Sequence, residues 1–221
     1  MNDGKKSLDD WSNRCYIVDM RTATPPETVD VRENILATGQ RLMAGKGFSA
    51  VGLNEILADA GVPKGSFYHY FGSKDAFGEA LLEHYFEAYL AELDVTLAQP
   101  GLTMAQRLIN YFQVWQQTQS FFDCQGKCLA VKMAAEVADL SEAMRLAIKR
   151  GTAGIVSRLS QAIGAGVAEG SLSIASDADG TANSLYQLWL GASVMVKIGR
   201  HTGPFESAMG TTRQILHLPL N

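Results

Sequence analysis

The sequence predicts an all-α fold, in which a small three-helix domain is joined by a long helix to a C-terminal helical bundle. Apolar residues recur at intervals of three and four residues across most of the chain, as they do along the buried face of a helix. No segment of useful length shows the alternating pattern of a half-buried β-strand. Glycine and proline separate the periodic segments, and serine or threonine precedes several of them, which is typical of helix ends.

The composition is that of a globular protein without a membrane span. Of the 221 residues, 47% are hydrophobic and 19% are charged, and the net charge is −4. No apolar run reaches the length of about 18 residues that a membrane helix needs, and the N-terminus lacks the apolar region of a secretory signal. The three cysteines, an odd number, favour free thiols over a disulfide framework. We therefore expect a cytoplasmic protein that does not bind membranes.

Residues 1–27 and 28–74 differ in their pattern. The first stretch mixes charged residues, serine and proline without periodicity, so we expect it to be a disordered tail. The second stretch should form the three-helix domain. Apolar spacing predicts its first helix over residues 27–46, and Gly45 and Gly47 around its end are typical of a helix C-terminus.

The next two predicted helices are short and close together. One covers residues 53–60 and places its apolar residues on a single face. Gly61 ends this helix, and Pro63 is suited to open the following one over residues 64–70, because its missing N–H costs nothing there. Two short helices separated by a tight turn are the arrangement of a helix-turn-helix.

Residues 75–221 should form the C-terminal domain. Ser73 is a good N-cap for a fourth helix that runs to about residue 98 and is long enough to join the two domains. Thr103 and Gln106 form a capping box that opens the next helix. Ser141 and Ser176 are expected to precede two later helices. Periodicity predicts the remaining helices at residues 128–137, 141–170, 176–198 and 205–216.

The predicted helix over residues 64–70 is suited to reading a DNA major groove. Its outward face offers hydrogen-bond donors and flat groups from Lys64, Ser66, Tyr68 and His69. Phe67 and Phe71 have the spacing of residues that anchor a helix inward, and Lys74 is placed to meet a phosphate. No acidic residue lies between Gly61 and Lys74. The negative net charge of the whole chain therefore does not exclude DNA binding.

This segment resembles the DNA-binding signature of the TetR family of bacterial repressors. Family members have Gly-Val, a small residue, Lys-Gly, a hydroxyl residue, an apolar residue, Tyr-His and an aromatic pair, followed by Ser-Lys. This chain has Gly-Val-Pro-Lys-Gly-Ser-Phe-Tyr-His-Tyr-Phe at residues 61–71 and Ser-Lys at 73–74. Gly52 departs from the pattern, in which serine or threonine caps the second helix, but glycine is a tolerable cap. The resemblance implies a DNA-binding set of Lys64, Gly65, Ser66, Tyr68, His69 and Lys74.

The resemblance also implies two partners, double-stranded DNA and a second copy of the chain. A single helix-turn-helix reads few bases, so proteins of this kind bind near-palindromic operators as homodimers. We expect the dimer surface on the last two helices. Large apolar residues gather there, namely Trp189, Leu190, Val194, Phe205 and Met209.

Cys128 is the candidate sensing residue of the C-terminal domain. It is expected in the first turn of a helix, beside Lys127 and one turn before Lys132. A helix N-terminus and neighbouring cations both favour the thiolate, which is the reactive form of cysteine. The residue chemistry leaves a second interpretation open, because free cysteines are usually small buried hydrophobes.

From Arg32 onward, most of the chain resembles one subgroup of the TetR family, whose members respond to electrophiles and oxidants through cysteine and control detoxifying reductases. The shared stretches are Gly-x-Cys-Leu-x-Val-Lys at 126–132, Ala-Glu-Val-x-Asp-Leu-Ser-Glu-x-Met-Arg at 135–145 and Leu-Trp-Leu-Gly-Ala at 188–192. This resemblance implies that Cys128 is the sensing residue. It also implies that a small electrophilic or oxidant inducer releases the repressor.

Two further residues are candidates for a part in sensing. Lys197 lies in an apolar stretch, where it either extends to solvent or lowers the pKa of a thiol and reacts with its oxidised form. Cys124 would meet Cys128 only if the segment were helical, and Gly126 favours a turn. No cluster of histidine and cysteine completes a four-ligand zinc site, so neither a metal nor a cofactor is expected.

Two alternatives stand beside the cysteine hypothesis. A repressor of the same fold can be released by a non-covalent apolar ligand in the C-terminal helical cavity, and its release would then persist without thiols. The other alternative is an enzyme. No nucleophile–base pair, phosphate-binding glycine loop or metal-ligand spacing supports an enzyme, and DNA reading already explains Ser66 and His69.

Overall fold

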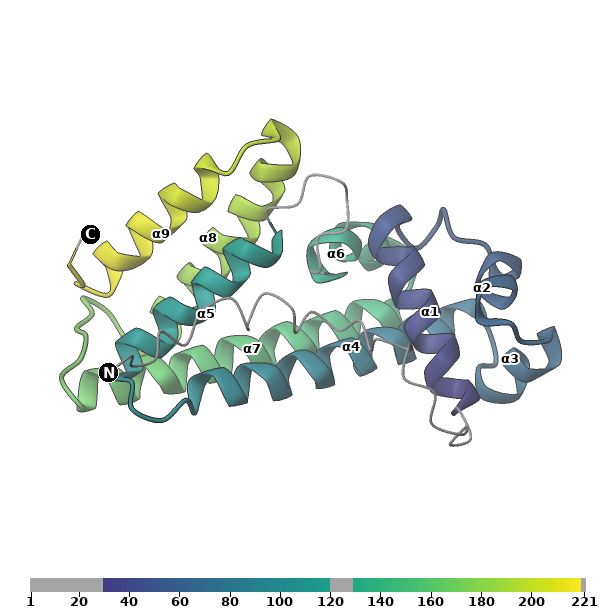
Figure 1. Ribbon diagram of the computed structural model, residues 1–221, viewed down its shortest axis with the longest axis horizontal. Coiled ribbons are helices and arrows are strands. Elements are labelled where there is room, and N and C mark those ends of the chain that lie inside the picture. The colour runs from purple at the N-terminus through teal and green to yellow at the C-terminus, as the bar shows by residue number, and fades with distance from the viewer. Residues whose placement is uncertain (1–29, 120–128, 220–221) are drawn as a thin grey trace, which may run out of the picture. The chain divides into compact units, whose positions relative to one another are not determined.

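The computed structural model describes residues 30–119 and 129–219, and within these ranges all regular structure is helical (Figure 1). The tail predicted over residues 1–27 and all three cysteines lie outside the described residues. The helices are α1 (Val31–Lys46), α2 (Leu53–Ala60), α3 (Lys64–Tyr70), α4 (Lys74–Leu97), α5 (Met104–Gln119), α6 (Leu129–Leu140), α7 (Glu142–Ala168), α8 (Ala178–Gly199) and α9 (Gly203–Ile215).

Local capping chemistry confirms several predicted helix starts. The Ser73 hydroxyl accepts a hydrogen bond from the Ala76 N–H (3.0 Å) at the start of α4. Thr103 and Gln106 form the expected capping box, in which each side chain accepts a hydrogen bond from the other residue's backbone N–H (2.9 and 3.3 Å). These contacts satisfy helix-end donors that have no partner within the helix itself.

The predicted start of α8 is wrong by one residue. The N-cap is Asp177, whose carboxylate accepts the Gly180 N–H (2.7 Å), and not Ser176. The Ser176 hydroxyl is hydrogen-bonded to the hydroxyl of Thr181 instead (3.1 Å). A carboxylate is the better partner at this position, because it accepts a charge-assisted hydrogen bond and lies at the positive end of the helix dipole. Helix α9 also starts earlier than predicted, at Gly203.

The two longest helices, α4 and α7, lie side by side along much of their length (Figure 1). Their close approach depends on a glycine. A Cβ at Gly151 of α7 would overlap the ring of Phe86 of α4, and that ring is buried. At the edge of the same contact, Arg158 donates two hydrogen bonds to the Asp94 carboxylate (2.6 and 2.9 Å).

Aromatic rings form the core between α5, α8 and α9. The Trp189 ring stacks between those of Phe112 and Phe205, with ring centroids 4.8 and 5.7 Å away. Its indole N–H donates to the Thr212 hydroxyl (2.9 Å). Trp189 and Phe205 are both fully buried within the chain, so their assignment to a dimer surface is wrong. Helical spacing identifies which residues share a face, but not which neighbour covers that face.

No helix among the described residues is both long and apolar enough to span a membrane. Even the longest, α4 and α7, carry charged residues along their length.

Candidate DNA interface and sensing residues

The turn between α2 and α3 follows from three consecutive residues. Gly61 ends α2 in the left-handed conformation (φ 66°), which glycine adopts without a steric penalty. The Val62 N–H then donates to the Leu57 carbonyl (3.1 Å), which closes the end of the helix. Pro63 is the N-cap of α3, directly before the predicted first helical residue Lys64, and its carbonyl accepts the Ser66 N–H (3.0 Å).

A cluster of aromatic rings anchors α3 to the chain. The side chain of Phe67 is fully buried, and its ring centroid lies 5.3 Å from that of Phe71 and 5.4 Å from that of Phe77 on α4. The predicted inward positions of Phe67 and Phe71 are thus confirmed. Burying such rings contributes a few kcal/mol each, on the order of 1.5–3, so this cluster holds a helix of only seven residues in place.

The opposite face of α3 is open to solvent. Lys64, Gly65 and His69 are exposed, and Ser66 is half-buried. The Tyr68 side chain is 50% exposed, although it is a large aromatic residue. The Lys64 ammonium lies 5.8 Å from the centre of the Tyr68 ring, so a cation and a flat donor project from the same patch. Exposed groups of these types are the ones that contact phosphates and base edges.

Lys74 has a partner that the local sequence pattern does not reveal. Its ammonium donates a hydrogen bond to the Phe48 carbonyl (2.9 Å) and lies 4.5 Å from the centre of the Phe48 ring. The lysine is half-buried as a result. An ammonium has three N–H groups, so this contact leaves others available to a phosphate.

Helix α1 supports α2 through contacts between distant residues. The Asn34 side chain donates to the Ala60 carbonyl (2.8 Å) and thereby satisfies an acceptor at the C-terminus of α2. Arg41 pairs with Asp59 (2.7 Å), but both side chains are largely exposed and such a pair contributes little, about 0–1 kcal/mol. The α1–α2–α3 arrangement therefore depends on packing and on the Asn34 contact.

The predicted sensing residues are only partly described. Cys128 immediately precedes α6 and, like Cys124, lies outside the described residues. Lys197 is described and lies in the last turn of α8, where its side chain is exposed. Among the described residues, no group of three or more histidines, cysteines and carboxylates could hold a metal ion.

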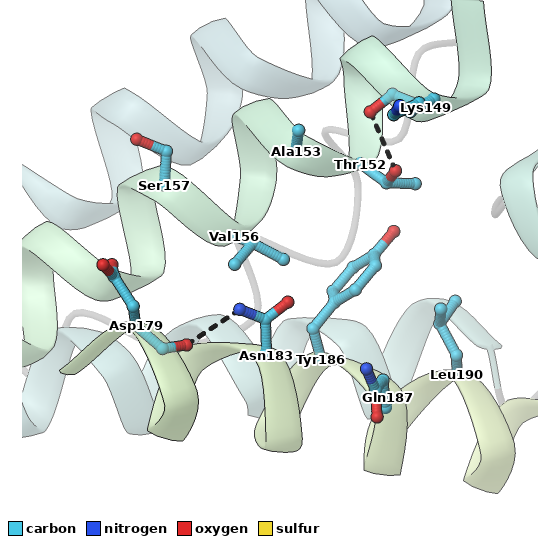
Figure 2. Close-up of a pocket in the computed structure, with 10 residues that line it drawn as sticks. All are labelled: Lys149, Thr152, Ala153, Val156, Ser157, Asp179, Asn183, Tyr186, Gln187 and Leu190. Carbon is cyan, nitrogen blue, oxygen red and sulfur yellow. Dashed lines mark hydrogen bonds between the residues drawn. The ribbon is translucent and has the colours of Figure 1, made fainter. Parts of the chain in front are cut away.

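A groove of about 570 Å³ lies between α7 and α8 (Figure 2). Figure 2 shows Asp179, Asn183 and Gln187 on one side and Thr152 and Ser157 on the other. The Asn183 side chain donates to the backbone carbonyl of Asp179 (2.9 Å). This groove is open to solvent, so it is not an enclosed cavity in which a non-covalent inducer would be largely buried.

Two family models match the chain, one in each half. The model described as "Bacterial regulatory proteins, tetR family" matches residues 35–81, which contain α2, the turn and α3. The model described as "Tetracyclin repressor-like, C-terminal domain" matches residues 105–212, from α5 into α9.

Individual relatives agree with the family models. The chain is 42% identical over 193 residues to the HTH-type transcriptional repressor NemR of Escherichia coli (strain K12). The aligned residues cover 86% of this chain and 96% of that protein. The chain is 32% identical over 176 residues to the HTH-type transcriptional repressor DhaR of Mycobacterium sp. (strain GP1), covering 80% and 87%. The crystal structure of the reduced form of E. coli NemR matches with a TM-score of 0.82, over 87% of this chain and all of that one.

Proposed function

The chain belongs to the TetR family and is a NemR-like transcriptional repressor, and from this premise we propose that electrophiles or oxidants release it from DNA by modifying Cys128. The observation that carries the DNA-binding part is the exposed patch on α3, opposite the buried Phe67 anchor. A short helix held rigidly by one face and polar on the other is what a recognition helix requires.

On DNA, we assign base and backbone contacts to the α3 face. Lys64, Ser66, Tyr68 and His69 face the major groove, Gly65 allows close approach, and Lys74 contacts a phosphate. Two copies of the chain present two α3 helices at the spacing of successive major grooves, roughly 34 Å. The operator is near-palindromic, because the symmetry of the dimer is repeated in its half-sites.

We place the dimer surface on the exposed apolar face of α8. Val194, Met195 and Ile198 are 45%, 52% and 70% exposed, which is unusual for adjacent large apolar residues. Leu190 lies one turn before Val194 and is half-buried. A second copy that covered these side chains would remove apolar surface from water and fix the distance between the two α3 helices.

For the sensing step, Cys128 is the residue whose surroundings in the sequence favour a thiolate, with Lys127 beside it and α6 beginning at the next residue. Lys197 is assigned a secondary part, as a cation that favours the thiolate or reacts with its oxidised form. The similarity to NemR, whose structure is described as a reduced form, supports a redox-dependent function. The genes under control are then those of detoxifying reductases.

Replacing Cys128 by serine should leave operator binding intact and abolish release by N-ethylmaleimide. Serine is nearly isosteric with cysteine but is not alkylated under the same conditions. The measurement is the Kd for a duplex taken from the DNA upstream of the protein's own gene, with and without the reagent. In the wild type, treatment should weaken binding by roughly 5–150-fold, the range of typical allosteric couplings.

Cys15→Ser and Cys124→Ser are the matched controls, since the chain contains three cysteines and each control removes a different thiol. Both controls should be released like the wild type. Normal release of Cys128→Ser would contradict the proposal. Release that persists after all three cysteines are replaced would instead indicate a non-covalent inducer.

A further inference from the structure

The loop between α1 and α2 is bound by a carboxylate from a distant helix. Glu136 of α6 accepts hydrogen bonds from two consecutive backbone N–H groups, those of Phe48 (3.1 Å) and Ser49 (2.7 Å). The partners are 88 and 87 residues apart in the sequence. Helix α6 also packs beside α1 (Figure 1). The segment that leads into α2 and α3 is therefore held from the C-terminal part of the chain.

Gly47 makes this contact possible. Its backbone has a φ of 89°, a conformation that residues with a side chain rarely adopt. A Cβ on Gly47 would also lie 2.8 Å from a carboxylate oxygen of Glu136, which is too close for the carboxylate to remain. The loop conformation and the position of Glu136 thus depend on each other.

Phe48 joins this loop to two further helices. Its carbonyl and its ring both contact the Lys74 ammonium at the start of α4. Its ring is buried, and both this ring and the sulfur of Met144 on α7 lie so close to Gly78 of α4 that a Cβ on Gly78 would overlap them. Residues of α4, α6 and α7 therefore surround Phe48, which lies in the short loop before α2.

The Glu136 carboxylate is charged under ordinary conditions. Burial alone would raise the pKa of Glu136, but hydrogen bonds from Ser49 and Phe48 and the nearby charge of Lys132 hold this pKa below its usual value. A glutamate with a lowered pKa stays ionised at neutral pH. Its carboxylate is protonated, and its contacts are weakened, only when the pH falls below the usual pKa of a glutamate. Hydrogen bonds from N–H groups to an ionised carboxylate are also stronger than neutral ones.

We propose that Glu136 is a positioning residue through which α6 sets the orientation of α1–α3, the DNA-binding head, and hence the operator affinity. This inference rests on the proposed function. Helix α6 begins at Leu129, about two turns before Glu136, and a helix moves as a rigid element over that length. The two hydrogen bonds tolerate only a few tenths of an ångström before they weaken. A small displacement of α6 therefore changes how the head is held.

Replacing Glu136 by glutamine tests the inference. The variant loses the charge and replaces one acceptor oxygen with an NH₂ group, which opposes the backbone N–H donors. Operator affinity of the untreated variant should fall by about tenfold, within the range of typical couplings. Its Kd should approach that of the wild type treated with N-ethylmaleimide, so that the ratio of treated to untreated Kd narrows towards one. A residue that only stabilised the fold would lower the melting temperature and leave this ratio unchanged.

Asp139→Asn is the matched control, because it removes the same charge from an exposed position on the same helix. It should bind and respond like the wild type. If the wild type and this control neither bind the duplex nor respond to the reagent, the proposed function itself fails and the inference falls with it. If both respond and Glu136→Gln shows the same ratio as the control, the function stands and the inference is overturned.

Gly47→Ala provides a second variant, which displaces the carboxylate from the loop side and also strains the backbone at its φ of 89°. Its ratio of treated to untreated Kd should narrow towards one, as in Glu136→Gln. Its control is Gly45→Ala in the last turn of α1, where nothing lies within 4 Å of an added Cβ. If Gly47→Ala behaves like Gly45→Ala in the DNA assay, the Glu136 contact does not position the head.

Discussion

Replacing Tyr68 by alanine is expected to remove most of the sequence-specific DNA affinity while leaving the fold intact. The Tyr68 side chain is 50% exposed on α3, where it makes an edge contact with the ring of Phe67 and lies 5.8 Å from the Lys64 ammonium. Its stability contribution is therefore small, whereas the proposed function assigns it a contact in the major groove. A good base contact contributes about 1–3 kcal/mol of discrimination. Because two copies bind, the loss should reach about 2–6 kcal/mol, or roughly 30-fold to more than 10,000-fold in Kd.

The measurement compares Kd values for the operator duplex and for a scrambled duplex of equal length, at fixed salt concentration. Only the operator Kd should rise strongly. Val95→Ala is a suitable control, since Val95 is 65% exposed on α4 and lies about 30 Å along that helix from Lys74. Equal operator affinity of Tyr68→Ala and Val95→Ala would exclude Tyr68 from the recognition face.

Replacing Gly151 by alanine is expected to destabilise the protein. The added Cβ would overlap the Phe86 ring near its attachment point, where the ring cannot swing aside. Overpacking of this kind costs about 1–3 kcal/mol. Forced separation of α4 and α7 would also disturb the Arg158–Asp94 contact at their edge.

Gly164→Ala on the same helix provides the opposite result. Nothing lies within 4 Å of its added Cβ, so the substitution should stabilise α7 by about 0.5–1 kcal/mol through the better helix propensity of alanine. Urea unfolding should separate the free energies of unfolding of the two variants by about 1.5–4 kcal/mol. The protein concentration is kept equal because the stability of a dimer depends on it. Equal stabilities would contradict the close α4–α7 contact.

Where the determining interactions are local, sequence patterns predicted the structure well. Helices α2 and α3 have the predicted bounds, because Gly61 and Pro63 act on the chain within a few residues of themselves. The exposed face of α3 follows from the same short segment, since Phe67 and Phe71, four residues apart, lie on one side of the helix and are buried there. The division of the chain at residue 74 and the DNA-contact and sensing roles of individual residues stay predictions.

Most of the predictions that were wrong, and the contacts that were not predicted, depend on residues far apart in the sequence. Trp189 and Phe205 have the spacing of an apolar helix face, but the tertiary structure buries them against α5 and against each other. The error at the start of α8 is the local exception, because the neighbouring Asp177 caps the helix in place of Ser176. No local signal pairs Glu136 with Phe48, because that contact forms only when α6 packs beside α1.

By itself, the amino-acid sequence determined the helical periodicity, the tight turn before α3 and the polar face that this helix presents. Each of these is set by neighbours within one or two helical turns. The tertiary structure decided which apolar faces are buried, which glycines admit a neighbouring helix, and how α6 holds the loop before α2. Those outcomes depend on packing between helices far apart in the chain, and helical periodicity does not specify the partner of each face.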